Sequence, residues 1–312
     1  MGLHQGRWNL QNGVNMLIHA LILLLLAPVM ARMSAPRPVE LELVRALPVK
    51  GATEPSGMTI RADRLFVVSD NDDQTIYELK IRETDALLTP HVRFNAPPLE
   101  GLRKLDFEGI SHDKKGGFYL VSESTSRVLH VSQDGQKTAW VTPDLSEEGR
   151  KKGLFQVNNG GLEGIACVSP HQFFLCAERQ ARGILKVKSQ GRQIQTQVWN
   201  CDERDWDSPY GRPPDFSDLY LEQDRLFALM RSDEGVAEMQ RDGERFRARQ
   251  FWSFGRTVRD PAYSYRDSTY GKAEGLSMDR KRIYLILDNN ADTRSNNDQD
   301  ARPLFFIFKR PN

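Results

Sequence analysis

Acidic side chains recur at a nearly constant spacing along this chain of 312 residues. The clearest copies are Glu108-Gly109-Ile110, Glu163-Gly164-Ile165 and Glu274-Gly275-Leu276, in which an acid precedes glycine and an aliphatic residue. Glu54 opens a looser copy and Ser217 a degenerate one, so that successive copies begin 54, 55, 54 and 57 residues apart. A regular period of about this length is typical of a propeller or a solenoid.

A second polar residue follows each of these positions after 14 to 16 residues, at the end of an apolar run. These residues are Asp70, Glu123, Glu178, Arg231 and Asp288. Turn-forming residues such as Lys115-Gly116-Gly117 lie between the two positions, which predicts a β-hairpin. Because the strands of a hairpin run antiparallel, we expect both polar residues of a copy at the same end of their sheet.

If the first strand of every copy is innermost, these side chains form a ring around one mouth of a central channel. Like charges at close range raise one another's pKa, and a hard cation would relieve that conflict. Ca²⁺ accepts six to eight oxygen ligands in flexible geometry, so we predict a calcium site. Its candidate ligands are Glu54, Asp70, Glu108, Glu123, Glu163, Glu178, Glu274 and Asp288.

A purely structural role is the alternative for the same residues. Each glycine could mark a place where backbones crowd near the axis, and each glutamate could accept hydrogen bonds from N–H groups of a neighbouring blade. One copy, however, carries Ser217 and Arg231 in place of its two acids. A hydroxyl and a cation suit an anion, which favours a functional ring.

Short strands are predicted to position these residues. In the second copy, strands over 127–132 and 137–142 follow the hairpin, which gives the four antiparallel strands of a propeller blade. We predict an all-β, five-bladed β-propeller, and a six-bladed ring is the alternative. Residues 39–45 should complete the last blade beside 305–308, so that no sheet edge stays free.

The connecting loops are unequal in length. Those at 143–161, 201–215 and 256–273 are long and rich in Gly, Pro, Asp and Tyr. Each leads into one of the repeated acidic or hydroxyl positions, so all three should cover the same face. Long loops on one face of a rigid scaffold are where binding sites usually lie.

The first 31 residues differ from the rest of the chain. Residues 16–26 form an apolar run, and small residues follow up to Ala31, which is typical of a secretory signal peptide. We predict cleavage there, a linker over 32–38 and one propeller domain over 39–312. The protein would then be exported, periplasmic or secreted, with no membrane span after cleavage. An uncleaved membrane anchor is the alternative.

Composition excludes several classes of protein. A formal net charge of +1 provides no basic field for nucleic acid and no polybasic patch for a membrane. The chain contains no nucleophile elbow, phosphate-binding loop or zinc-binding helix motif. Cys167, Cys176 and Cys201 allow at most one internal disulfide, and we expect none.

The acid-glycine-aliphatic copies, together with Ser-Asp-Asn at 69–71 and Ala-Glu-Arg at 177–179, resemble the phytase-like family ("esterase-like activity of phytase") and the related SdiA-regulated propellers. The resemblance extends from about residue 40 to the end of the chain. It implies a secreted or periplasmic protein that hydrolyses phosphoesters with the help of calcium. It also assigns the metal to the eight acids named above.

For such a phosphoesterase, the predicted catalytic residues are Glu108, Glu163, Glu274 and Arg231, with the acids holding metal or orienting water. The predicted substrate-binding residues are Arg179, Ser217 and Lys272. The substrate would be a small phosphorylated or ester compound. Turnover that does not depend on metal would instead indicate a hydroxyl nucleophile, with Ser56, Ser111, Ser217 or Ser277 as candidates. The alternative function is a non-catalytic propeller that binds a ligand or partner protein of the cell envelope.

Overall fold

The computed structural model describes residue 2 and residues 37–311, except for 53, 103, 191, 192, 204, 205 and 207. The chain divides into two units, Met1–Ser34 and Ala35–Asn312, and every described strand belongs to the second. Apart from residue 2, the predicted signal peptide, its cleavage site and most of the predicted linker lie outside the described residues. No helix in the described part of the chain is both long and apolar enough to cross a membrane.

Short and mostly antiparallel strands form four hydrogen-bonded sheets. The first sheet contains β7 (Phe107–His112), β8 (Phe118–Ser122), β9 (Arg127–Val131) and β10 (Thr138–Trp140). The second contains β11 (Leu162–Ser169), β12 (Gln172–Ala177), β13 (Gly183–Gln190) and β14 (Gln193–Asn200). The third contains β15 (Asp218–Glu222), β16 (Arg225–Met230), β17 (Gly235–Asp242) and β18 (Arg245–Ser253), with β1 (Val39–Glu40) at its edge.

The fourth sheet has eight strands in the order β19-β20-β21-β2-β6-β5-β4-β3. One half consists of β19 (Ala273–Met278), β20 (Arg282–Leu287), β21 (Leu304–Lys309) and β2 (Glu42–Lys50). The other half consists of β3 (Pro55–Arg61), β4 (Arg64–Ser69), β5 (Asp72–Ile81) and β6 (Ala86–Arg93). Each half is antiparallel, and the two are joined where β2 and β6 pair in parallel over only two residues.

The predicted closure between the two ends of the chain is confirmed for β2, which pairs antiparallel with β21 and places Leu47 opposite Phe305. The prediction was wrong for residues 39 and 40, because β1 pairs in parallel with β18 instead. The chain changes sheet at Leu41. Its N–H donates to the Ser253 carbonyl at 2.7 Å, and its side chain is buried in the adjoining core.

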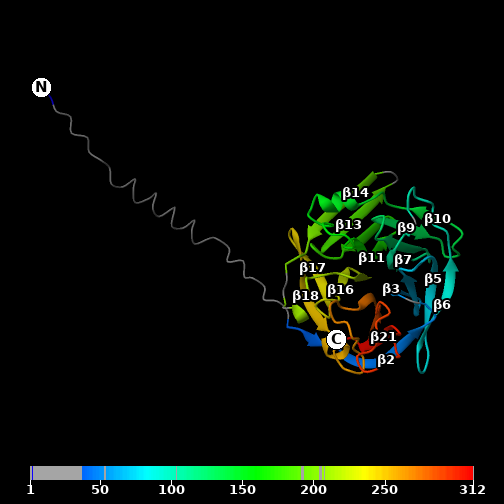
Figure 1. Ribbon diagram of the computed structural model, residues 1–312. Coiled ribbons are helices and arrows are strands. Elements are labelled where there is room, and N and C mark those ends of the chain that lie inside the picture. Colours follow the sequence, from blue (N-terminus) through cyan, green and yellow to red (C-terminus); the bar gives the residue numbers. More distant parts are fainter. Residues whose placement is uncertain are drawn as a thin grey trace. The chain divides into compact units, whose positions relative to one another are not determined.

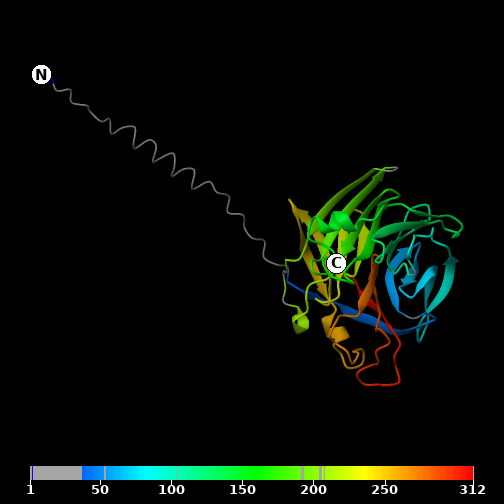
Figure 2. The same cartoon turned by 45° about the horizontal axis from the view of Figure 1, so that its top comes forward.

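The sheets stand around a common centre (Figures 1 and 2). The first strand of each repeat, β3, β7, β11, β15 or β19, contacts the first strands of the repeats on either side. A Cβ added at Gly109 would lie 2.4 Å from the Glu163 carbonyl oxygen, and one at Gly57 would lie 2.5 Å from that of Glu108. The predicted use of glycine for close approach near the axis is therefore confirmed. This is the arrangement of a β-propeller.

The core lies between neighbouring sheets. Every residue of β8 is buried, because both faces of this strand are covered by other sheets. Phe227 and Trp252 from one sheet pack with Phe306 and Phe308 from the next. Burial of apolar surface contributes roughly 25 cal/mol per Å², so these contacts hold the inner strands in place.

Candidate functional site

The two polar residues of each repeat meet at one end of their sheet, as the hairpin predicted. The N–H of Glu123 donates to the Asp106 carbonyl at 2.9 Å, and the N–H of Glu178 donates to the Gly161 carbonyl at 3.0 Å. In each case the end of the second strand is thereby fixed beside the start of the first. The side chains of both positions consequently face the same space.

The strand pairing corrects the sequence alignment of the first repeat. The residues that follow Glu54 and Asp106 occupy the same place in their hairpins, and both Glu54 and Asp106 have a left-handed backbone, with φ of 48° and 58°. Glu54 therefore corresponds to Asp106, and Ser56 corresponds to Glu108. The Ser56 hydroxyl donates to Glu108 Oε2 at 2.6 Å.

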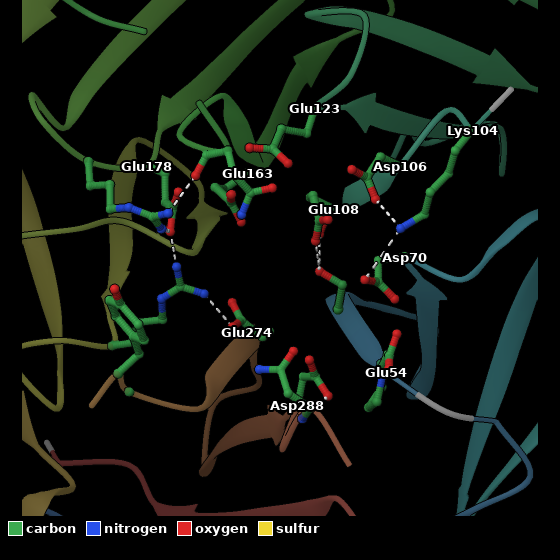
Figure 3. A pocket seen from close by; sticks show the side chains of 18 residues that line it. Glu54, Asp70, Lys104, Asp106, Glu108, Glu123, Glu163, Glu178, Glu274 and Asp288 are labelled. Carbon is green, nitrogen blue, oxygen red and sulfur yellow. Dashed lines mark hydrogen bonds and ion pairs between the residues drawn. The ribbon is translucent and has the colours of Figure 1, made fainter. Parts of the chain in front are cut away.

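All eight predicted metal ligands line a single cavity of about 290 Å³ at this end of the ring (Figure 3). Asp106 is a ninth carboxylate in this acidic pocket, and the cationic side chains of the lining are Lys104, Arg179 and Arg231. With every group ionised, acids would exceed bases by six charges. The remaining lining residues are Pro55, Ser56, Asn159, Tyr270, Gly271 and Asn290.

Two of the predicted loops contribute Asn159, Tyr270 and Gly271 to this lining. The third contributes Tyr210 to an adjoining cavity of about 250 Å³, which shares Arg231, Tyr270 and Gly271 with the acidic pocket. The prediction that the long loops cover the acidic face is therefore confirmed for 143–161 and 256–273, whereas 201–215 covers the cavity beside it. α2 (Ser146–Arg150), the 3₁₀ turn η1 (Pro209–Gly211) and α3 (Gly255–Val258) belong to these loops.

The first acidic cluster consists of Asp70, Asp106 and Glu108. One carboxylate oxygen of each lies within 4.8 Å of the others. The Lys104 ammonium is 2.7 Å from Asp106 Oδ1 and 3.7 Å from Asp70 Oδ2 (Figure 3). The cluster thus carries three acids against one internal cation.

The second acidic cluster consists of Glu123, Glu163 and Glu178, whose oxygens also approach within 4.8 Å of one another. Glu123 Oε1 accepts a hydrogen bond from the Gly161 N–H at 2.9 Å. The Arg179 guanidinium contacts Glu178 Oε1. Glu163 and Glu178 are only 6% and 1% exposed, so this cluster is the more enclosed of the two.

Arg231 bridges the second cluster to the last repeat. Its guanidinium contacts Glu178 Oε1 and Glu274 Oε1, and its Nε lies 3.0 Å from Asp215 Oδ2. Burial opposes the charge of Arg231, but the carboxylates of Glu274 and Asp215 outweigh it and raise the pKa of the guanidinium. Arg231 is therefore held in its charged form by three acids.

Burial raises the pKa of six carboxyl groups in the acidic pocket, those of Asp70, Glu108, Glu123, Glu163, Glu274 and Asp288. The pKa of Asp70 reaches about 7, raised also by Glu54 and Asp288 and opposed by Lys104. The pKa of Glu274 reaches about 7 in spite of Arg231. Such shifts mean that the ionised pocket is short of positive charge.

Glu108 and Glu163 show the same effect more strongly. Burial holds the pKa of both carboxyl groups well above the ordinary range. Nearby carboxylates add to it, namely Asp106 and Glu274 beside Glu108, and Glu108 and Glu123 beside Glu163. The innermost acids of the pocket are thus the ones that most need a counter-charge.

The carboxylate oxygens of the acidic pocket fit a calcium ion. Asp70 Oδ1, Glu178 Oε2 and Glu274 Oε2 are buried and accept no hydrogen bond from any described residue. A buried oxygen without a partner is costly, and a cation would satisfy it. Carboxylates offer only oxygen ligands, which suit Ca²⁺ better than Zn²⁺, an ion that binds nitrogen and sulfur.

Comparison with known proteins assigns the chain to a family. Residues 52–291 match the family model described as phytase-like, esterase-like activity of phytase. The chain belongs to this phytase-like family. No curated protein matches the sequence.

Solved structures show the fold that this phytase-like chain shares. The glutaminyl cyclase of Myxococcus xanthus superposes with a TM-score of 0.52 at 12% identity, covering 88% of this chain and 100% of that chain. The aldose sugar dehydrogenase of Streptomyces coelicolor, in its PQQ-bound form, gives 0.44 at 12% identity, with coverages of 88% and 100%. Virginiamycin B lyase from Staphylococcus aureus gives 0.41 at 10%, with 86% and 74%. The first superposition supports the β-propeller fold and nothing finer.

The predicted substrate-binding residues of this phytase-like chain lie in different places. Arg179 lines the acidic pocket. Ser217 is buried outside that lining, and its hydroxyl donates to the Ala273 carbonyl at 2.8 Å. Lys272 lines the adjoining cavity, with its ammonium 3.7 Å from Asp267. Of the four serines considered as nucleophiles, Ser56 is the one that lines the acidic pocket.

Sequence reasoning missed Lys104, Asp106 and Asp215. A signal for the two acids was present, because an acid stands two residues before the inner position in three repeats. The pairs are Glu54 and Ser56, Asp106 and Glu108, and Asp215 and Ser217. Lys104 has no such signal, since it lies in the connection before β7, the first strand of its repeat.

The structural alternative is realised by another residue. Asp218 stands where the other inner strands carry glycine, and it is fully buried. Its Oδ2 accepts hydrogen bonds from the N–H groups of Leu276 at 2.8 Å and Met58 at 3.4 Å, which belong to β19 and β3. Asp218 therefore joins three inner strands below the acidic pocket. Cys167, Cys176 and Cys201 are all free thiols.

Proposed function

We propose that this protein is an exported, calcium-dependent phosphoesterase of the phytase-like kind, acting at the acidic mouth of the propeller channel. One observation carries the proposal: nine carboxylates line one cavity with only three cations, and three of their buried oxygens have no partner among the described residues. An acidic pocket of this charge would repel an anionic ester unless a cation were bound. Family membership supports ester hydrolysis as the activity.

The two acidic clusters supply the proposed calcium ligands. Bound calcium would provide Lewis-acid polarisation of a phosphoryl oxygen and would lower the pKa of a water molecule. Glu108 and Glu163 are the innermost acids of their clusters, and we assign them to metal binding and to orienting water. Glu274, held by Arg231, shares these roles.

Arg179 and Arg231 are assigned to the phosphate group of the substrate. The side chains are 19% and 12% exposed and present N–H groups to the pocket, and a guanidinium binds phosphate oxygens in pairs. Ser217 is assigned to positioning β19 through its hydrogen bond to the Ala273 carbonyl. Lys272 lines the adjoining cavity. Tyrosines 210, 263 and 270 line that cavity, which suits the organic part of the ester.

We also infer that the ring has five blades, completed by β2. Support comes from the pairings, because β2 finishes an antiparallel group with β19, β20 and β21, and its two-residue contact with β6 is all that merges this group with the next. Export is inferred from the apolar leader and its small-residue site.

A non-catalytic cation- and ligand-binding propeller is the second candidate. It is favoured by the contacts of Arg179 and Arg231, which both reach the same oxygen of Glu178. Cations held in this way leave fewer donors for a substrate anion. The calcium pocket would then serve stability or recognition.

A substrate panel distinguishes the two functions. Phosphomonoesters, phosphodiesters and carboxylic esters should be assayed with Ca²⁺ and with a chelator. We expect phosphoester turnover that requires Ca²⁺ and is lost in Glu163→Gln. The matched control is Glu147→Gln, whose side chain is 77% exposed and outside the pocket. Tight calcium binding without turnover of any ester would establish the second candidate, and turnover in chelator would refute the role of the metal.

A further inference from the structure

A second cavity opens at the other end of the ring. It has a volume of about 620 Å³ and lies at the far ends of β3, β7, β11 and β15. None of the described residues that line it also lines the acidic pocket. The narrow waist of the ring separates the two, since a Cβ at Gly164 would lie 2.6 Å from the Asp218 Cα. The distal cavity therefore has no part in the proposed hydrolysis.

The walls of the distal cavity are mostly apolar. Their apolar side chains include Met58, Ile60, Ile110, Val168, Leu219 and Leu221. Ile60, Leu221 and Val168 carry the apolar surface of this wall, since the first two are half-buried and Val168 is 41% exposed, whereas Met58, Ile110 and Leu219 are buried beneath it. Concave apolar spaces of roughly 300–1,000 Å³ are typical of small-molecule sites.

The rim of the distal cavity carries a net positive charge. Glu222 is held by Arg310 through bonds of 2.8 and 2.6 Å. Asp113 accepts hydrogen bonds from the N–H groups of Lys115 at 2.8 Å and of Gly117 at 3.1 Å. The ammonium groups of Lys114 and Lys115 form no ion pair within the described part of the chain. An anion at the rim would therefore meet two lysines against the single carboxylate of Asp113.

We propose that the distal cavity binds a single-chain anionic amphiphile, of which a medium-chain fatty acid is the simplest example. The chain lies against the apolar ends of the inner strands, and the anionic head lies at Lys114 and Lys115. Burial of the alkyl chain stabilises one part of the ligand, and charge pairing with the lysines stabilises the other. Each added methylene should tighten binding by roughly four-fold while the chain still fits.

Calorimetric titration of the mature protein tests this site directly. The probes are octanoate, decanoate and dodecanoate, with decanol as an uncharged match for decanoate. We expect saturable binding of one molecule per chain, tighter with chain length, and about ten-fold tighter for decanoate than for decanol. Titration with decyl phosphate shows whether the head group must be a carboxylate or only an anion.

Two variants assign the site. Reversing both rim charges with Lys114→Glu and Lys115→Glu should weaken decanoate binding about ten-fold or more and leave decanol unchanged. Val168→Glu should weaken both ligands, because it places a charge on the apolar wall. Lys152→Glu is the matched control, since Lys152 is an exposed lysine in a loop away from this cavity.

Several outcomes would overturn the proposal. One is the absence of saturable decanoate binding by folded wild-type protein, with folding judged by its melting curve. Another is equal loss of decanoate binding in the Lys152→Glu control. A third is sedimentation showing a dimer that dissociates in Val168→Glu, because the cavity would then be covered by a second copy of the chain.

Discussion

Asp218 is a side chain that joins inner strands at the centre of the ring. It is fully buried and accepts hydrogen bonds from the N–H groups of Leu276 and Met58, so one carboxyl group connects β15, β19 and β3. Asp218→Ala would leave these donors buried without a partner, and each such loss costs about 1–3 kcal/mol. We expect the free energy of unfolding in urea to fall by roughly 3 kcal/mol.

The matched control is Asp224→Ala, at an exposed position in the turn between β15 and β16. Exposed substitutions of this kind usually change stability by about 0.5 kcal/mol or less. Equal unfolding midpoints for the two variants would show that Asp218 does not join the strands as described.

Arg231 allows the proposed phosphate binding to be tested without removing its charge. Arg231→Lys keeps a cation among Glu178, Glu274 and Asp215 but removes the planar fork that contacts all three. If Arg231 binds phosphate, kcat/KM for the best phosphoester should fall on the order of a hundred-fold. Arg64→Gln, which breaks an exposed pair with Glu78, is the control and should leave the rate unchanged.

Residue spacing was sufficient to predict eight of the nine acids of the pocket. A hairpin brings its two ends together, and the repeat brings successive hairpins around one centre, so all eight predicted ligands line one cavity. Spacing could not reveal what each side chain contacts. Ser217 was predicted for a substrate, yet its hydroxyl reaches the Ala273 carbonyl, because inner strands lie closer together than a repeat pattern discloses.

At the scale of elements, the inner hairpin strands were predicted better than the strand that closes the ring. The apolar runs that end in a polar residue became β4, β8, β12, β16 and β20, since continuous burial on both faces requires continuous apolar sequence. The start of the closing strand was placed too early. Nothing in the local sequence distinguishes β1, which pairs with β18, from the start of β2, which pairs with β21, because apolar and acidic residues alternate without a break over 39–43.

The loop between β20 and β21 permits a pH-dependent test that does not involve the acidic pocket. Arg302 binds Asp300 at 2.7 and 3.0 Å and lowers the pKa of its carboxyl group to about 2. An acid with a lowered pKa stabilises the fold above its unfolded value of about 3.9, and this contribution is lost as pH falls through about 2. Since Arg302 is 48% exposed, we expect only about 1 kcal/mol.

Urea unfolding of Asp300→Asn against the wild type measures this contribution. The difference should be about 1 kcal/mol at pH 7 and should shrink progressively between pH 4 and pH 2. Asp224→Asn, at an exposed position in the turn between β15 and β16, provides the control. A difference that grows on acidification would contradict the assigned ion pair.

At the scale of the whole molecule, the period of the sequence predicted a ring of antiparallel sheets, and the fold confirms a β-propeller. The predicted cleavage at Ala31 stays a prediction. Intact mass of the protein recovered from its native host should correspond to a chain that begins after Ala31. A mature chain that retains residues 16–26 would indicate a membrane anchor instead.

The charge of the whole ring leads to the last prediction. Nine carboxylates around one cavity face three cations, so the ion-free protein carries an electrostatic cost that calcium would remove. A ligand at a hundred-fold excess over its Kd stabilises a protein by about 2.7 kcal/mol. In a domain of this size, that corresponds to a rise in Tm of roughly 5–10 °C. Mg²⁺ should have a smaller effect, because it prefers octahedral geometry and retains its water.

Melting curves in Ca²⁺, Mg²⁺ and chelator measure this stabilisation. Combining Glu163→Gln with Glu178→Gln removes two acids of the second cluster, so the double variant should respond less to Ca²⁺ and melt higher than the wild type in chelator. Glu147→Gln, outside the pocket, should respond as the wild type does. A wild-type melting temperature that is the same in chelator and in millimolar Ca²⁺ would rule out calcium as the ion that balances this ring.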